Sequence, residues 1–230
     1  MPDSNLLILE DAAQKLRALL DSVVFVGGAT LGLLITDTGA APIRATVDVD
    51  VIAEITTRME YFDFSERLRR NGLTEDARPG APVCRWLHDG LVLDLMPLDK
   101  AVLGFTNRWY GAALNGAQNL RLPSGVSIRT ITAPYFLGTK IEAFRGRGRQ
   151  DFYESRDLED FVAVIDGRES ILEEIALSPT ELRSFLAEAA HELLGESRFL
   201  GVLPGYLLPD EISQQRLPGL LRRLREISAQ

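Results

Sequence analysis

Two short stretches indicate the fold: FVGGAT at residues 25–30 and RATVDVDV at residues 44–51. The first is an apolar run that ends in two glycines, and a helical pattern follows it. In the second, Asp48 and Asp50 stand two residues apart. Because side chains two apart on a strand share one face, about 6.5 Å from each other, both carboxylates are predicted to point the same way. The alternate positions are predicted to point into the core: Val47, Val49 and Val51.

The chemistry of these stretches predicts an anionic ligand that carries a metal ion. Two adjacent carboxylates repel each other, and a divalent cation offsets that repulsion. Gly27 and Gly28 at the start of a helix would let a phosphate approach backbone N–H groups at the positive end of the helix dipole. The sequence therefore predicts a metal-bound polyphosphate.

Composition is that of an ordinary globular protein. The 230 residues are 46% hydrophobic and 25% charged, so the chain can build a sizeable core. No apolar run reaches the ~18 residues that span a bilayer, and the first residues lack a basic signal-peptide region. We therefore expect a cytoplasmic protein that does not enter a membrane. The net charge of −8 argues against broad, non-specific binding of nucleic acid.

The cysteine and histidine content argues against a disulfide-stabilised protein and against a zinc site. The single cysteine, Cys84, cannot form an internal disulfide, and its apolar neighbours predict a buried side chain rather than a nucleophile. His88 and His191 are far apart and have no cysteine partners, which disfavours a zinc site.

Periodicity predicts strands in the first half and helices in the second. Helices are expected over 6–20, 29–35, 56–70, 109–114, 132–144, 155–165, 171–176, 180–194 and 209–227; strands over 23–26 and 47–53; and hairpins over 83–95 and 120–128. The predicted organisation is an α+β domain at 1–130, followed by a helical C-terminal domain at 131–230.

Asp94 completes a predicted constellation of carboxylates. It lies in the second arm of the 83–95 hairpin, where a charge in mid-strand requires a partner. Three carboxylates on neighbouring strands can hold two divalent ions, and such sites favour in-line displacement at phosphorus. Asp94 would be placed to accept the proton of an attacking hydroxyl.

The order Gly-Gly, Asp-x-Asp and a third Asp resembles the nucleotidyltransferase superfamily with the DNA polymerase beta-like fold. The fuller strings GGATL (27–31) and RATVDVDV (44–51) are similar to the abortive-infection (AbiEii/AbiGii-like) toxin nucleotidyltransferases. A second block resembles the same family: TAPY (132–135), KIEAFR (140–145) and SRDLED (155–160). The resemblance covers about residues 20–168 and implies a mixed sheet with flanking helices.

The resemblance also implies an enzyme that moves an NMP from an NTP to an acceptor hydroxyl, with two Mg²⁺ or Mn²⁺ ions. Asp48, Asp50 and Asp94 would bind metal. The implied nucleotide contacts are Gly27, Gly28, Thr30, Lys140, Asp157 and Asp160, with Lys140 neutralising the triphosphate. Lys140 and the arginine-rich loop of the helical domain would complete the site.

A dense basic segment is the only feature of the sequence that supports an RNA acceptor without the family resemblance. Arg145, Arg147, Arg149 and Arg156 either form a solvated loop or clamp an RNA backbone. The family resemblance implies a toxin that modifies the 3′ end of tRNA and is paired with an antitoxin protein.

Two other functions compete with this one. The acceptor could be a small molecule, since an acidic protein suits a cationic substrate. The fold could also be a catalytically silent module that binds nucleotide or a partner. Two of the candidate site residues also have structural explanations. Asp157 could cap the start of a helix, and Lys140 could be a solvated helix residue.

Overall fold

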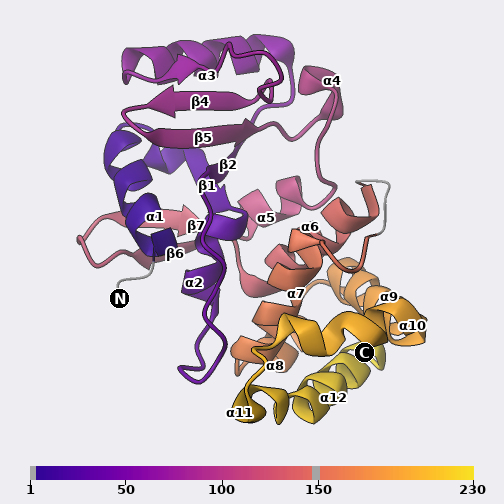
Figure 1. The fold of residues 1–230 in the computed structure, drawn as a ribbon. Helices are drawn as coiled ribbons and strands as arrows, with labels where there is room; N and C mark the ends of the chain where they lie inside the picture. Colours follow the sequence, from indigo (N-terminus) through magenta and orange to yellow (C-terminus); the bar gives the residue numbers. More distant parts are fainter. Residues whose placement is uncertain (1–3, 147–150) are drawn as a thin grey trace. The chain divides into compact units, whose positions relative to one another are not determined.

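The computed structural model describes residues 4–146 and 151–230, which form two compact units (Figure 1). The first unit combines the chain up to Gly32 with Arg44–Thr132. The second combines Leu33–Ile43 with Ala133–Gln230. Thus one short segment of the N-terminal half belongs to the helical second unit.

The first unit is built on a seven-stranded mixed sheet with the order β3-β4-β5-β2-β1-β7-β6. The strands are β1 (Val23–Val26), β2 (Val49–Ala53), β3 (Thr74–Glu75), β4 (Arg85–His88), β5 (Leu91–Met96), β6 (Gln118–Arg121) and β7 (Ser127–Thr130). β2 runs parallel to β5 and antiparallel to β1, while β4 and β5 form the predicted hairpin. The predicted α+β class is confirmed.

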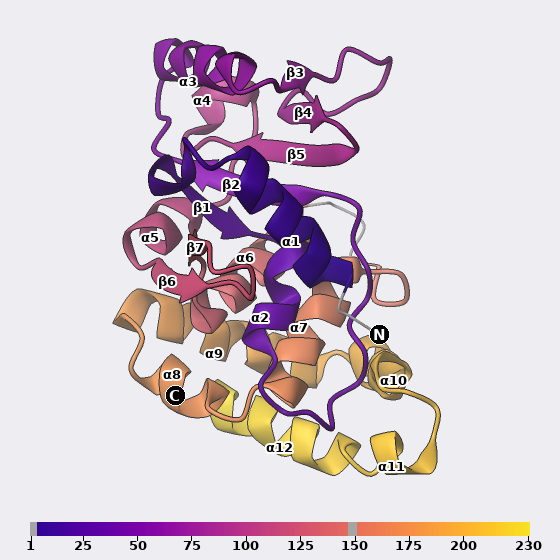
Figure 2. The same cartoon turned by 90° about the vertical axis from the view of Figure 1, so that its left-hand side faces the viewer.

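Helices flank this sheet: α1 (Ser4–Lys15), α3 (Arg58–Arg70), α4 (Lys100–Leu103) and α5 (Tyr110–Asn115). α1 and α5 lie on opposite sides of β1 and β2 (Figures 1 and 2). The core between the layers includes the fully buried side chains of Leu9, Phe25 and Trp86. Burial of such large apolar side chains contributes about 1.5–3 kcal/mol each and fixes the strands on which the acidic residues lie.

The acidic strand is shorter than predicted. β2 begins at Val49, and both Val49 and Val51 are fully buried as expected. The prediction for Val47 is wrong, because 76% of this side chain is exposed. The pairing of β2 begins at Asp50 with β1 and at Val49 with β5, so the strand alternation does not extend back to Val47. Asp48 therefore lies just before the strand, whereas Asp50 lies within it.

The second unit is helical: α6 (Ala133–Gly146), α7 (Arg156–Gly167), α8 (Ile171–Ala176), α9 (Thr180–Gly195), α10 (Ser197–Val202), α11 (Glu211–Gln214) and α12 (Leu217–Ser228). α6 packs on α7, and α9 packs on α12. The predicted helix at 209–227 is two helices, α11 and α12. Within the described ranges, no helix has the length and apolar character needed to cross a membrane.

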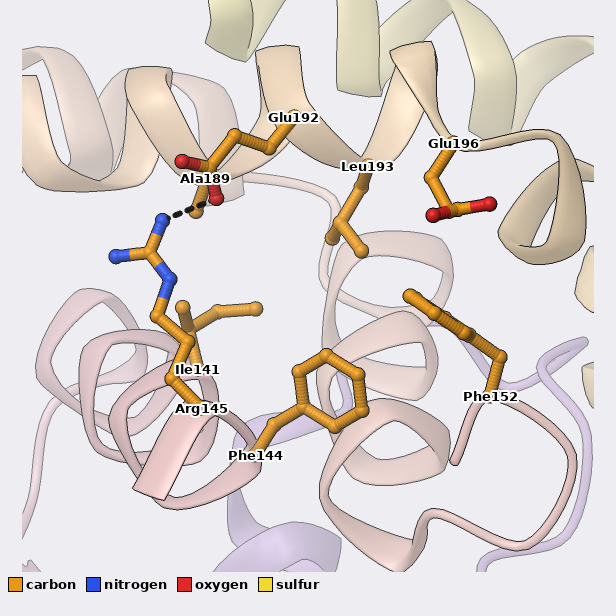
Figure 3. Close-up of a pocket in the computed structure, with 8 residues that line it drawn as sticks. All are labelled: Ile141, Phe144, Arg145, Phe152, Ala189, Glu192, Leu193 and Glu196. Carbon is orange, nitrogen blue, oxygen red and sulfur yellow. Dashed lines mark hydrogen bonds and ion pairs between the residues drawn. The ribbon is translucent and has the colours of Figure 1, made fainter. Parts of the chain in front are cut away.

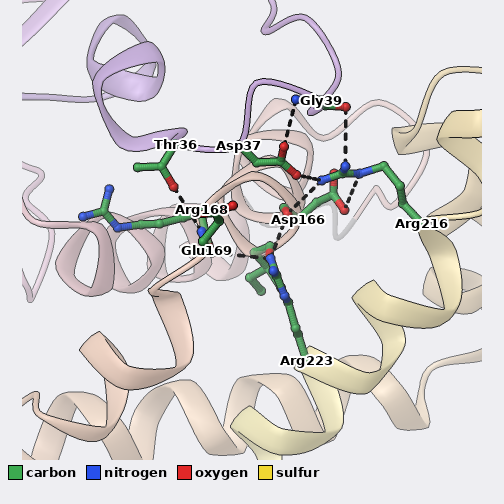
Figure 4. Close-up of polar contacts among 9 residues, drawn as sticks. Thr36, Asp37, Gly39, Asp166, Arg168, Glu169, Arg216 and Arg223 are labelled. Atoms are coloured by element: carbon green, nitrogen blue, oxygen red, sulfur yellow. Dashed lines mark hydrogen bonds and ion pairs between the residues drawn. The ribbon is translucent and has the colours of Figure 1, made fainter.

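Charged contacts fasten the 33–43 segment to the helices of the second unit (Figure 4). Arg216 donates to Asp37 over 2.7 Å and to Asp166, at the end of α7, over 2.8 Å. Arg223 of α12 donates to the carbonyls of Ile165 and Asp166. The carbonyls at the end of α7 thus gain cationic donors, which stabilises a helix C-terminus.

Candidate functional site

Three acidic residues meet on one part of the sheet in the first unit. The parallel register of β2 and β5 places Asp50 directly beside Asp94. Asp48, just before β2, belongs to the same cluster, because one nitrogen of Arg85 contacts both Asp48 and Asp94. Asp94 is 5% exposed, whereas Asp48 and Asp50 are half-buried. The structure therefore brings together the three carboxylates that the sequence singled out.

Gly27 lies against this cluster because of the pairing between β1 and β2. Val26 pairs with Asp50, so the next residue lies beside the Asp50 side chain. A Cβ atom on Gly27 would lie 1.9 Å from Oδ2 of Asp50, and the backbone of Gly27 has a φ of +72°. Both observations require glycine at this position.

An arginine that the sequence analysis missed bridges two of the carboxylates. Arg85 of β4 lies opposite Asp94 in the antiparallel pair. Its Nε and Nη2 donate to Oδ1 and Oδ2 of Asp94 over 2.8 and 2.7 Å, and Nη2 also reaches Oδ2 of Asp48 over 3.0 Å. The hydrogen bonds to Asp94 raise the pKa of the Arg85 guanidinium. Arg85 therefore stays charged, and its pair with Asp94 does not break by deprotonation.

A second missed residue, Asn5 of α1, holds the backbone on either side of the site. It is fully buried. Its amide nitrogen donates to the carbonyls of Arg44 and Gly28 over 3.0 and 3.4 Å, and its oxygen accepts from the Thr46 amide over 2.9 Å. Thr46 in turn donates to Oδ1 of Asp48 over 2.8 Å. Asn5 thus couples the glycine loop to the start of the acidic strand.

The glycine loop leads directly into helix, as predicted. A 3₁₀ turn over Gly28–Thr30 continues into α2 (Leu31–Leu34). The hydroxyl of Thr30 is fully buried and donates to the Gly27 carbonyl over 2.9 Å. Thr30 therefore supports the turn from inside, and a role for it in phosphate binding stays a prediction.

The carboxylates fit a divalent ion by the chemistry of their donors, because Mg²⁺ and Mn²⁺ prefer carboxylate oxygens. Among residues 4–146 and 151–230, however, no three acidic, histidine or cysteine side chains are arranged closely enough to hold a metal as they stand. In this arrangement both oxygens of Asp94 accept hydrogen bonds from Arg85.

Three other predicted residues form a group of ion pairs within the second unit. Nζ of Lys140 on α6 lies 2.6 Å from Oδ2 of Asp160 and 3.5 Å from Oδ1 of Asp157, both on α7. The side chains are 11%, 1% and 6% exposed, respectively. The helical spacing of the aspartates thus places both carboxylates beside the Lys140 ammonium.

The basic segment lies in part outside the described residues, which exclude Arg147 and Arg149. Arg145 pairs with Glu192 and its guanidinium covers the Phe185 ring at 4.9 Å. It borders a cavity of about 140 Å³ within the second unit (Figure 3). The remaining lining residues are Ile141, Phe144, Phe152, Ala189, Glu192, Leu193 and Glu196. Arg156, at the start of α7, is exposed.

Cys84 adjoins Arg85 and is 3% exposed, which confirms its predicted burial. Burial, together with the nearby charge of Asp94, raises the pKa of the thiol to about 12. We expect the native thiol to react with Ellman's reagent at about pH 8 at least a hundredfold more slowly than the urea-unfolded chain, since the thiolate is the reactive species. Equal rates would contradict this environment.

No family profile matches the chain, and no curated protein matches it. Two solved structures are similar to it. An antigenic nucleotidyltransferase-like protein from Paracoccidioides brasiliensis has a TM-score of 0.52 at 20% identity, over 87% of this chain and 93% of that one. A candidate nucleotidyltransferase from H. pylori has a TM-score of 0.52 at 11% identity, over 100% and 96%. At these identities the likeness shows the fold alone, and that fold is nucleotidyltransferase-like, as predicted.

Proposed function

We propose that this protein is a metal-dependent nucleotidyltransferase that moves an NMP from an NTP to an acceptor hydroxyl. The observation that carries the proposal is the register of β2 and β5, which sets Asp50 beside Asp94 on a nucleotidyltransferase-like fold. Asp48, Asp50 and Asp94 would hold divalent ions, which supply charge neutralisation for the triphosphate and acidify the attacking hydroxyl.

In the proposed reaction the acceptor oxygen forms a bond to the α-phosphorus of the NTP. The bond from that phosphorus to the oxygen bridging the β-phosphate breaks, and pyrophosphate leaves. The hydroxyl proton passes to the carboxylate of Asp94. The N–H groups of Gly27 and Gly28 would bind the phosphates, and glycine at position 27 lets the loop pass close to Asp50.

The acceptor in our proposal is RNA, at the 3′ end of tRNA, and the protein is a toxin held in check by an antitoxin. The support for this finer proposal is the resemblance of the GGATL and RATVDVDV strings to the abortive-infection toxins. The exposed guanidinium of Arg156 is available for a phosphate backbone. The net charge of −8 does not favour RNA, so the acceptor has to be tested directly.

The test is label transfer from each of the four NTPs, with Mg²⁺, to total tRNA and to a panel of small hydroxyl compounds. We expect transfer to RNA, and a loss of about a hundredfold or more in Asp48→Ala, because a charged group of the reacting site is removed. Glu66→Ala is the control, since Glu66 forms an exposed pair with Arg69 on α3 of the same unit and is expected to leave transfer unchanged. Absence of transfer to any acceptor would contradict the proposal, as would full activity in Asp48→Ala.

One observation favours a second candidate, the catalytically silent module. The arginine that joins Asp48 to Asp94 occupies the carboxylates that catalysis would need. A silent module predicts that NTP binds, as measured by calorimetry, but that no pyrophosphate is released with any acceptor. Pyrophosphate release that depends on Asp48 would exclude it.

A further inference from the structure

The guanidinium of Arg85 offsets one of the three negative charges of the carboxylate cluster. The planar guanidinium binds Asp94 through two parallel hydrogen bonds and reaches Asp48 through a third. Such forked contacts to a carboxylate are the strong form of a charge-assisted hydrogen bond. Only 8% of the Asp94 side chain and 22% of the Arg85 side chain are exposed, so water screens this pair poorly.

A divalent ion and this guanidinium compete for the same oxygen atoms. Both oxygens of Asp94 accept from Arg85, and Asp48 offers one oxygen to Arg85 and the other to Thr46. An ion bound to these oxygens would lie within a few ångströms of the guanidinium, where two positive charges repel strongly. The ion can therefore bind Asp94 well only after the guanidinium has moved away.

We propose that Arg85 is a positioning residue that blocks the metal site. It pairs with Asp48 and Asp94 until metal and nucleotide bind together, and it then releases both carboxylates. This inference rests on the proposed function, because it takes the three carboxylates as metal ligands. A triphosphate provides the released guanidinium with a new anion, which arginine binds through the same forked geometry. Metal ion and NTP are then expected to bind cooperatively, and the metal alone weakly.

The test measures Mn²⁺ binding by calorimetry and by electron paramagnetic resonance, in the full chain, with and without a non-hydrolysable NTP analogue. Without nucleotide, Arg85→Gln is expected to bind Mn²⁺ roughly tenfold more tightly than the wild type, because the competing charge is gone. The analogue should tighten Mn²⁺ binding by about tenfold in the wild type and by much less in Arg85→Gln. Arg198→Gln, which removes a forked arginine–glutamate pair of the second unit, should match the wild type.

A second variant protects the test against misfolding. Arg85→Gln leaves the buried Asp94 without its forked partner, which destabilises the fold. Circular dichroism shows whether the variant is folded. Arg85→Lys keeps the positive charge but loses the fork, so its Mn²⁺ affinity should fall between those of the wild type and Arg85→Gln. If Arg85→Gln does not fold, Arg85→Lys decides the question.

The outcomes separate this inference from the proposed function. Mn²⁺ affinity that is unchanged or weaker in both Arg85 variants would overturn the inference and leave the transfer proposal standing. Tighter Mn²⁺ binding in the variants, combined with no transfer in the wild type, would support the blocking role of Arg85 and overturn the transfer proposal. A wild type and variants that bind no Mn²⁺ even with the analogue would overturn both.

Discussion

Replacing Gly27 by alanine is expected to lower nucleotidyl transfer by about a hundredfold or more, because the carboxylate of Asp50 is forced out of position. The added Cβ atom would lie 1.9 Å from Oδ2 of Asp50, so one of the two groups has to move. The φ of +72° and ψ of −168° also belong to a backbone region that is essentially restricted to glycine. Transfer, Mn²⁺ binding with the NTP analogue and the melting temperature would be measured together.

Gly104→Ala is the matched control for this prediction. Gly104 has a φ of +89° at the end of α4, and a Cβ atom there would meet no other atom within 4 Å. The control carries a backbone penalty of about 1 kcal/mol without a collision. We expect a small fall in melting temperature and normal transfer. Equal activity in the two alanine variants would refute the importance of the contact between Gly27 and Asp50.

The carboxylate cluster could be predicted from sequence because its signals are local. The spacing of Asp48 and Asp50 fixes their common side, and the Asp-Gly turn at residues 89–90 defines the hairpin that carries Asp94. The same turn pairs positions that are equally distant from it, which sets Arg85 opposite Asp94. The hairpin register, counted outward from the turn, is therefore a sequence signal for the contact between Arg85 and Asp94.

Other features carry no comparable signal. Asn5 bonds to the backbone of Arg44, 39 residues away, and in the sequence it is simply a polar residue at the start of a helix. Residues 33–43 contact residues of the second unit that are as distant in the sequence, such as Arg216, which is 179 residues from Asp37. Such contacts follow from tertiary packing rather than from periodicity. Val47 was misplaced for a related reason, since alternation alone does not show where strand pairing begins.

Replacing Lys140 by methionine is expected to lower the free energy of unfolding of the second unit by about 3–5 kcal/mol, the usual cost of removing one partner of a buried ion pair. Lys140 lies 2.6 Å from Asp160 and 3.5 Å from Asp157, and its ammonium offsets two buried carboxylates. Urea unfolding would be followed by far-ultraviolet circular dichroism, which reports the helices. Both tryptophans, Trp86 and Trp109, lie in the first unit, so their fluorescence provides a separate probe.

Two further variants distinguish this stabilising role from binding of a triphosphate. Adding Asp160→Asn to Lys140→Met should recover part of the lost stability, because a buried charge is removed with its partner. Arg222→Met, which breaks an exposed pair with Glu226 in the same unit, should cost less than about 0.5 kcal/mol. If Lys140→Met instead unfolds like the wild type and raises the KM for NTP at a temperature where it is folded, the ammonium acts on the nucleotide. A structural role for the pair with Asp160 requires the opposite result, a lowered unfolding midpoint in the circular dichroism signal with an unchanged KM.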